Sequence, residues 1–210
     1  MSPQSGKPED PTIQRRLGRM DPALGRWVQG LPALRPLQAR GPLWVSLSRI
    51  VCGQQLSVAA ARTIWKRLET ELGSSSGRWS ARSVAEADPD RLRSAGLSGA
   101  KTRAVLGLAE ASVQRRLTRH RWANLSDAAL IEELIALPGI GPWSAKMTLI
   151  FDFHRPDVFA PEDAGLRRAI RVLEGLDELS TDEAEARAEA WAPYRSTACR
   201  LLWHALDAEP

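Results

Sequence analysis

Residues Leu134–Ile150 read LIALPGIGPWSAKMTLI, the most informative stretch of the chain. Two apolar segments with helical periodicity flank a turn that carries two glycines and two prolines. Gly139 and Gly141 permit a positive φ and leave backbone N–H groups uncovered beside the helix that starts at Trp143. Such groups attract phosphate, so the stretch predicts a phosphate-binding hairpin, although a bare turn of this kind more often only connects two helices.

The rest of the chain also has a helical pattern, and we find no convincing run of alternating apolar and polar residues. The predicted fold class is therefore all-α. Residues 73–77 (GSSSG) read as a flexible loop between helices. We expect helices near residues 11–30, 43–51, 57–72, 80–87, 88–95, 100–116, 126–137, 143–153, 162–173, 181–191 and 194–206.

Composition excludes several classes of function. The 210 residues carry a net charge of +4, which is compatible with a polyanionic partner but is a weak signal. No apolar run is long enough for a membrane span, and the N-terminus lacks a signal-peptide core. Cys52 and Cys199 are expected to be buried free thiols in a reducing cytoplasm, and two cysteines cannot hold an iron–sulfur cluster. The three histidines are not at zinc-ligand spacing.

A candidate catalytic carboxylate lies downstream of the hairpin. Residues 157–170 read DVFAPEDAGLRRAI, and Asp163 stands at the start of a predicted helix, 22 residues after Gly141. Taken alone, Asp163 is best explained as an N-cap worth about 1 kcal/mol.

Several separate motifs together resemble the helix-hairpin-helix superfamily of DNA repair glycosylases. The hairpin LPGIGPWSA and the segment DVFAPED are followed by WAPYRSTACRLLW at 191–203. They are preceded by IVCGQQLSVAAARTIWKRL at 50–68 and RSAGLSGAKTRAVLGLA at 93–109. The resemblance extends over roughly residues 43–206 in the family's order, and within the superfamily it is strongest to the 3-methyladenine DNA glycosylase II group.

The resemblance implies a two-lobed helical HhH-GPD glycosylase fold with the active-site cleft between the lobes. We divide the chain into a disordered lead at 1–12, an N-terminal helix and link at 13–42 packed on the C-terminal lobe, and a central helical lobe at 43–137. Residues 138–210, with the hairpin and the catalytic segment, are expected to complete the second lobe.

The same resemblance implies roles for individual residues. Asp163 would be the catalytic carboxylate, which stabilises an oxocarbenium-like sugar while the base departs. An aromatic pocket would hold a cationic base, although core packing is the commoner role of any single tryptophan. The residues expected to line this pocket are Trp143, Trp203, Met147, Trp44 and Tyr194.

DNA contacts follow in the same way. Gln55 would fill the space left by a flipped nucleotide, although Gln54 and Gln55 without the resemblance read as turn residues. The full set of expected DNA-binding residues is Gly139, Ile140, Gly141, Ser144, Gln54, Gln55 and Lys101. The resemblance also implies a potassium or sodium ion held by the backbone carbonyls of Ile135, Leu137 and Ile140, with no other cofactor required.

The reaction type follows from one position. Bifunctional relatives carry a lysine nucleophile where this chain has Trp143, so a monofunctional glycosylase is expected, with Lys146 as the alternative amine. The expected substrate is double-stranded DNA with alkylated bases, and the expected state is a cytoplasmic monomer. A non-catalytic lesion-sensing module and a bifunctional glycosylase/lyase are the alternatives, and the preferred lesion is left open.

Overall fold

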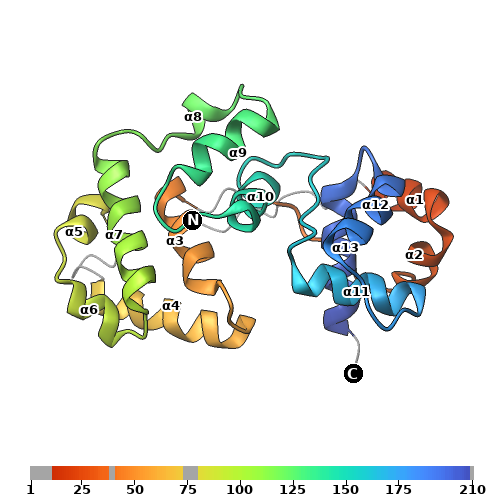
Figure 1. The fold of residues 1–210 in the computed structure, drawn as a ribbon, viewed down its shortest axis with the longest axis horizontal. Coiled ribbons are helices and arrows are strands. Elements are labelled where there is room, and N and C mark those ends of the chain that lie inside the picture. The colour runs from red at the N-terminus through yellow and green to blue at the C-terminus, as the bar shows by residue number, and fades with distance from the viewer. Residues whose placement is uncertain (1–10, 38–40, 73–79, 209–210) are drawn as a thin grey trace, which may run out of the picture. The chain divides into compact units, whose positions relative to one another are not determined.

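The computed structural model describes residues 11–37, 41–72 and 80–208 (Figure 1). Every regular element in these ranges is a helix, which confirms the predicted all-α class. The chain divides into two compact units, one formed by Met1–Gln38 with Leu149–Pro210 and the other by Ala39–Thr148. In the described ranges no helix has the length and apolar character needed to cross a membrane.

The central unit contains the helices that carry the hairpin. Its apolar core includes Leu47 on α3, Leu108 on α7 and Leu134 on α9, all fully buried. Serine, threonine and aspartate side chains cap several of these helices, which is why they start where they do. The elements are α3 (Leu43–Gly53), α4 (Val58–Leu72), α5 (Ala81–Ala85), α6 (Pro89–Ser94), α7 (Gly99–Val113), α8 (Arg119–Trp122), α9 (Asp127–Ile135) and the larger part of α10 (Pro142–Phe151).

The other unit joins the two ends of the chain. Its elements are α1 (Pro11–Met20), α2 (Pro22–Trp27), α11 (Ala164–Glu174), α12 (Thr181–Ala188), η1 (Glu189–Trp191) and α13 (Arg195–Ala208). α1 packs on α2, α13 and η1, and α2 packs on α11.

A buried carboxylate connects these elements. The side chain of Asp21 accepts hydrogen bonds from the backbone N–H of Leu24, from Arg187 on α12 and from Trp191 Nε1 on η1. Asp21 thereby holds the N-terminal helices against the C-terminal ones.

Two predicted helices need correction, and one helix was missed. The helix expected at 11–30 is two helices, because Asp21 ends one and caps the next. The helix expected at 181–191 ends at Ala188 and continues as a 3₁₀ turn, and α8 was not predicted at all. The loop expected at 73–77 and most of the expected lead at 1–12 lie outside the described residues, although α1 already begins at Pro11.

The hairpin belongs to the central unit. It was predicted to lie in the second lobe, with the rest of residues 138–210. The reason for the difference is tertiary packing. A Cβ added to Gly139 would lie 2.5 Å from Cβ of Ala104 on α7, and one added to Gly107 would lie 2.8 Å from Pro138. The turn therefore lies directly against α7, and the division falls inside α10, at 148/149.

Candidate functional site

The glycine turn has the geometry expected of a backbone anion site at only some of its positions. Gly139 adopts φ of +75°, whereas Gly141 does not have a positive φ, contrary to expectation. Gly141 instead leaves open space, since a Cβ added there would meet nothing within 4 Å. Its carbonyl accepts the first helical hydrogen bond of α10, from Ala145 N–H at 2.9 Å. The half-buried Gly141 and the start of α10 are thus the part of the turn available to a phosphate.

Two predicted DNA contacts of the turn are used inside the protein. The N–H of Ile140 bonds back to the carbonyl of Leu137 at 3.3 Å, and its side chain is buried. The hydroxyl of Ser144 is buried and accepts a hydrogen bond of 2.9 Å from Gln54 Nε2. These two side chains therefore shape the turn and present no polar group to solvent.

Gln54 fastens the segment between α3 and α4 to the hairpin. Besides Ser144, its Nε2 donates to the carbonyl oxygen of Gly139 at 2.9 Å. Two motifs that lie 85 residues apart in the sequence are joined by this one side chain. Gln54 was predicted to contact DNA. In the structure its side chain holds the hairpin in position.

Lys101 has a similar internal role. Its ammonium donates to the carbonyl oxygens of Cys52 at 3.0 Å and of Gln54 at 2.7 Å. These carbonyls lie at the C-terminal end of α3, where backbone acceptors lack helical partners and carry partial negative charge. Two of the three ammonium donors are thus engaged within the protein.

Gln55 differs from its neighbours in conformation and exposure. It is exposed at the turn between α3 and α4 and has φ of 56°, in the left-handed region that non-glycine residues rarely adopt. Leu56 beside it is 40% exposed. A strained, protruding side chain on a turn that Gln54 and Lys101 hold in place suits the expected insertion into a duplex.

Asp163 is the N-cap of α11, and its position is fixed from two directions. Its Oδ1 accepts the backbone N–H of Leu166 at 2.8 Å and the indole Nε1 of Trp203 at 3.1 Å. The Trp203 ring also stacks on Phe151, with centroids 5.8 Å apart. Asp163 therefore caps α11, and Trp203 on α13 also holds its carboxylate in position.

Gly165 is a residue that sequence reasoning missed. A Cβ at this position would lie 3.0 Å from Oδ1 of Asp163 and 3.4 Å from the Trp203 ring. Glycine allows this close approach, and a larger residue would push on the Asp163 carboxylate, although φ at Gly165 is not positive. Local sequence gives no signal for it, because Trp203 is far away in the chain.

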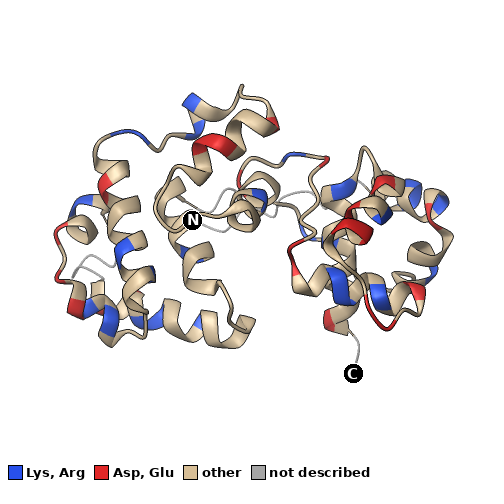
Figure 2. Cartoon of the chain, viewed as in Figure 1, with Lys and Arg blue, Asp and Glu red and all other residues tan. Residues whose placement is uncertain are grey.

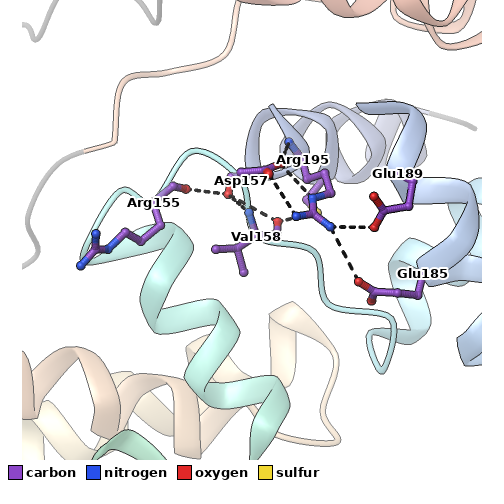
Figure 3. Close-up of polar contacts among 8 residues, drawn as sticks. Arg155, Asp157, Val158, Glu185, Glu189 and Arg195 are labelled. Atoms are coloured by element: carbon purple, nitrogen blue, oxygen red, sulfur yellow. Dashed lines mark hydrogen bonds and ion pairs between the residues drawn. The ribbon is translucent and has the colours of Figure 1, made fainter. Parts of the chain in front are cut away.

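The segment that leads to Asp163 is anchored by a charged cluster, shown in Figure 3. Arg195 donates from Nε and Nη2 to the two carboxylate oxygens of Asp157, at 2.8 and 3.0 Å. It also pairs with Glu189 at 3.1 Å and with Glu185 at 3.8 Å. Burial raises the pKa of Asp157, but the hydrogen bonds and charge of Arg195 outweigh it and hold that pKa below its ordinary value.

Ser196 completes the anchor. Its hydroxyl accepts the N–H of Val158 at 3.0 Å and donates to the carbonyl of Arg155 at 2.6 Å. Arg195 and Ser196 both belong to the motif WAPYRSTACRLLW, and no role was predicted for either residue. The structure shows that they attach the start of α13 to the chain before Asp163.

The five predicted pocket residues differ in exposure. Trp44 is 3% exposed and Met147 is 5% exposed, so neither side chain offers a surface to a base in this conformation. Trp143, Trp203 and Tyr194 are half-buried. The hydroxyl of Tyr194 accepts a hydrogen bond of 2.8 Å from Arg16 on α1. Trp143 and Trp203 therefore each keep part of the ring surface accessible, and their role in a base pocket stays a prediction.

The described residues contain no group of three or more histidine, cysteine or acidic side chains that could hold a metal ion. Both cysteines are buried, as expected, and neither forms a disulfide. Burial raises the pKa of Cys52 to about 12, and it raises the pKa of Cys199 as well. Neither thiol is a candidate nucleophile, since the thiolate is the reactive form.

A glycine turn at the N-terminus of α10, secured to α3 and α7, and an indole-supported aspartate at the N-terminus of α11 define the class as a helix-hairpin-helix DNA repair protein. The family model for the HhH-GPD superfamily base excision DNA repair protein matches residues 48–193. The chain belongs to this superfamily.

Individual relatives agree with the assignment. DNA-3-methyladenine glycosylase 1 of Schizosaccharomyces pombe is 31% identical over 172 residues, which cover 80% of this chain and 74% of the relative. The solved structure of a 3-methyladenine DNA glycosylase of that yeast in complex with abasic DNA superposes with a TM-score of 0.83 and is 27% identical in sequence. The match covers 91% of this chain and 95% of the solved one. A DNA-3-methyladenine glycosidase of Bacillus halodurans gives a TM-score of 0.76 at 28% identity, and the match covers 96% of this chain and 92% of that one.

Proposed function

We propose that this protein is a monofunctional DNA glycosylase that hydrolyses the N-glycosidic bond of alkylated bases in double-stranded DNA and leaves an abasic site. The observation that carries the proposal is the fixed carboxylate of Asp163, with Oδ1 held by Leu166 N–H and Trp203 Nε1. The relatives named above as 3-methyladenine glycosylases support the class of substrate.

The chemistry needs one positioned negative charge. The bond between C1′ and the base nitrogen breaks, and its electron pair leaves with the base. An alkylated base such as 3-methyladenine or 7-methylguanine is already cationic, so it leaves as a neutral molecule without a general acid. Positive charge develops at the sugar, and the carboxylate of Asp163 stabilises it. Water then adds to C1′, and Asp163 can accept the proton that the water loses.

DNA binding in this proposal uses the backbone near Gly141 and the protruding Gln55. A contact made by backbone amides reads phosphate and carries no sequence information, which suits an enzyme that must search any sequence for damage. Gln55 would occupy the space of the flipped nucleotide. Trp143 and Trp203 would offer aromatic faces to the cationic base.

We also propose that the hairpin binds a potassium or sodium ion. α9 ends at Ile135, so carbonyl oxygens at this end lack helical partners and carry partial negative charge. The carbonyls of Ile135, Leu137 and Ile140 would hold the ion, although Leu137 also accepts the N–H of Ile140 at 3.3 Å. Replacing sodium and potassium with tetramethylammonium at constant ionic strength should then weaken DNA binding. Unchanged affinity would remove the ion from the proposal.

We further propose that the protein acts as a monomer, close to the DNA it repairs, in the cytoplasm or at the nucleoid if the source is bacterial. Analytical ultracentrifugation of the free protein tests the first part, since a dimer at working concentration would contradict it.

One experiment separates the proposed function from its alternatives. The protein is incubated with methylated duplex DNA, released base is measured, and strands are analysed with and without alkali. A monofunctional enzyme releases base and yields strands that break only after alkali. A lesion-sensing module would release no base. A lyase would nick without alkali, and borohydride would trap an adduct that is absent in Lys146→Ala.

The catalytic assignment is tested on the same substrate. Asp163→Asn should slow base release on the order of 10²–10³-fold while DNA binding survives, because one preorganised charge is lost. Glu162→Gln is the matched control, since Glu162 is the adjacent acid and is exposed. Near-normal excision by the Asn variant, or an equal loss in the control, would show that Asp163 is not the catalytic carboxylate.

A further inference from the structure

The two N-terminal helices form a groove that none of the proposed catalytic residues uses. α1 and α2 approach closely because Gly18 faces Gly25, where an added Cβ would lie 2.9 Å from the Gly18 backbone. Beside this contact lies a groove of about 660 Å³. Its lining residues are Pro11, Gln14, Arg15, Gly18, Arg19, Pro22, Gly25, Arg26, Val28, Gln29, Gly30 and Leu31.

The charge of this groove has one sign. Arg15, Arg19 and Arg26 are exposed, and among the described residues no acid belongs to the lining. Arg15 and Arg19 are four residues apart on α1, so they share a face of the helix. Figure 2 shows basic residues along this pair of helices. The groove therefore concentrates positive charge on a protein whose formal net charge is only +4.

Among the described residues 11–31, Asp21 is the only acidic residue, and its carboxylate is engaged elsewhere. Asp21 lies between α1 and α2 and is 5% exposed. Its carboxylate accepts hydrogen bonds from Arg187 on α12 and Trp191 on η1. Within the described part of the chain, none of the three groove arginines forms an ion pair. The Nε of Arg15 donates to the carbonyl oxygen of Pro11 at 3.3 Å, so its terminal nitrogens, with the guanidinium groups of Arg19 and Arg26, are the donors available to an external anion.

The lining favours phosphate over a protein partner. Guanidinium groups bind phosphate oxygens through two parallel hydrogen bonds, and the amides of Gln14 and Gln29 add further donors. Protein interfaces instead depend on buried aromatic anchors, and the part of the lining that the structure describes contains no aromatic residue. We propose that the α1–α2 groove binds backbone phosphates of duplex DNA, as a contact surface separate from the hairpin. The proposal shares with the proposed function only the premise that DNA is the partner.

The test compares two variants of equal charge. The groove variant carries Arg15→Gln, Arg19→Gln and Arg26→Gln. The control carries Arg67→Gln, Arg82→Gln and Arg116→Gln, which are exposed arginines of the central unit. Each variant loses three positive charges, so both fall from +4 to +1. Affinity for undamaged duplex DNA is measured by fluorescence anisotropy over a series of salt concentrations, with thermal unfolding as the check on folding.

The groove variant should bind at least about tenfold more weakly at low salt, and the slope of log affinity against log salt should fall by about two to three. The control should retain most of its affinity and slope. Lysine at the same three groove positions should restore most of the binding, because the charge returns. Equal behaviour of the groove variant and the control would overturn the proposal, as would a lysine variant that binds no better than the glutamine variant.

A second measurement keeps this inference distinct from the proposed function. Single-turnover excision at saturating protein reports the chemistry at Asp163 and should be unchanged in the groove variant. Absence of excision in the unaltered protein would defeat the proposed function, yet the salt series would still decide whether the groove binds DNA. Excision that is lost while affinity is unchanged would also overturn the proposal, since the arginines would then serve the active site.

Discussion

The indole Nε1 of Trp203 donates a hydrogen bond of 3.1 Å to Oδ1 of Asp163. The same oxygen accepts the backbone N–H of Leu166, so α13 and the first turn of α11 hold the carboxylate together. An N-cap alone has freedom about its side-chain torsions, and the indole removes part of it. Trp203 is therefore expected to serve as a positioning residue for Asp163 as well as an aromatic face.

Trp203→Phe separates these two roles, because it keeps an aromatic ring and removes the donor. Single-turnover base release should slow about tenfold, which corresponds to the loss of a hydrogen bond to a charged group. The dissociation constant for undamaged DNA should stay the same. A Phe variant with full excision rate would show that the hydrogen bond does not support catalysis.

The two hairpin glycines should respond differently to alanine. Gly139→Ala introduces a Cβ 2.5 Å from that of Ala104, at φ of +75°, so unfolding should become easier by about 2–3 kcal/mol. Gly141→Ala meets nothing within 4 Å and should leave the melting temperature nearly unchanged. It should still weaken binding to damaged and undamaged duplexes alike, because the contact is to phosphate. An altered lesion preference with normal affinity for undamaged DNA would contradict the phosphate role of Gly141.

Asp21→Asn should destabilise the fold by about 2–3 kcal/mol, because Arg187 would lose its ion pair with this buried carboxylate and keep the one with Glu174. Burial raises the pKa of Asp21, but the hydrogen bonds from Leu24, Arg187 and Trp191 outweigh it, and the net pKa lies below the ordinary value. This stabilisation is complete above the unfolded-state pKa of about 3.9 and is lost as the pH falls through the lower folded-state value.

Urea denaturation at a series of pH values checks both statements. The stability difference between the unaltered protein and Asp21→Asn should be constant from neutral pH down to about pH 4 and should shrink below it. Stability that differs equally at all acidic pH values would show that the Asn variant acts through packing alone.

The two thiols should be inert in the native protein. Burial raises the pKa of Cys52 to about 12 and also raises that of Cys199, so almost no thiolate exists near neutral pH. A thiol reagent such as iodoacetamide should modify neither cysteine until the protein unfolds, as mass spectrometry would report. Rapid native modification of Cys52 would mean that α3 opens locally.

The sequence by itself determined the elements that depend on near neighbours. Asp163 is a helix cap that the local pattern identifies, because its side chain bonds to the backbone N–H three residues later. The glycine turn and the all-α class follow from the same kind of short-range signal. The spacing of the motifs also indicated that Asp163 is the candidate catalytic carboxylate.

Only the tertiary structure decided how distant side chains are used. Lys101 and Gln54 read as DNA contacts in the sequence, yet they hold the α3–α4 turn and the hairpin in place. The donor to Asp163 comes from a residue 40 positions further along the chain, and the preference for glycine at Gly165 follows from that approach. These contacts depend on where two helices meet. Hydrophobic packing of whole helices sets that geometry, and no local pattern encodes it.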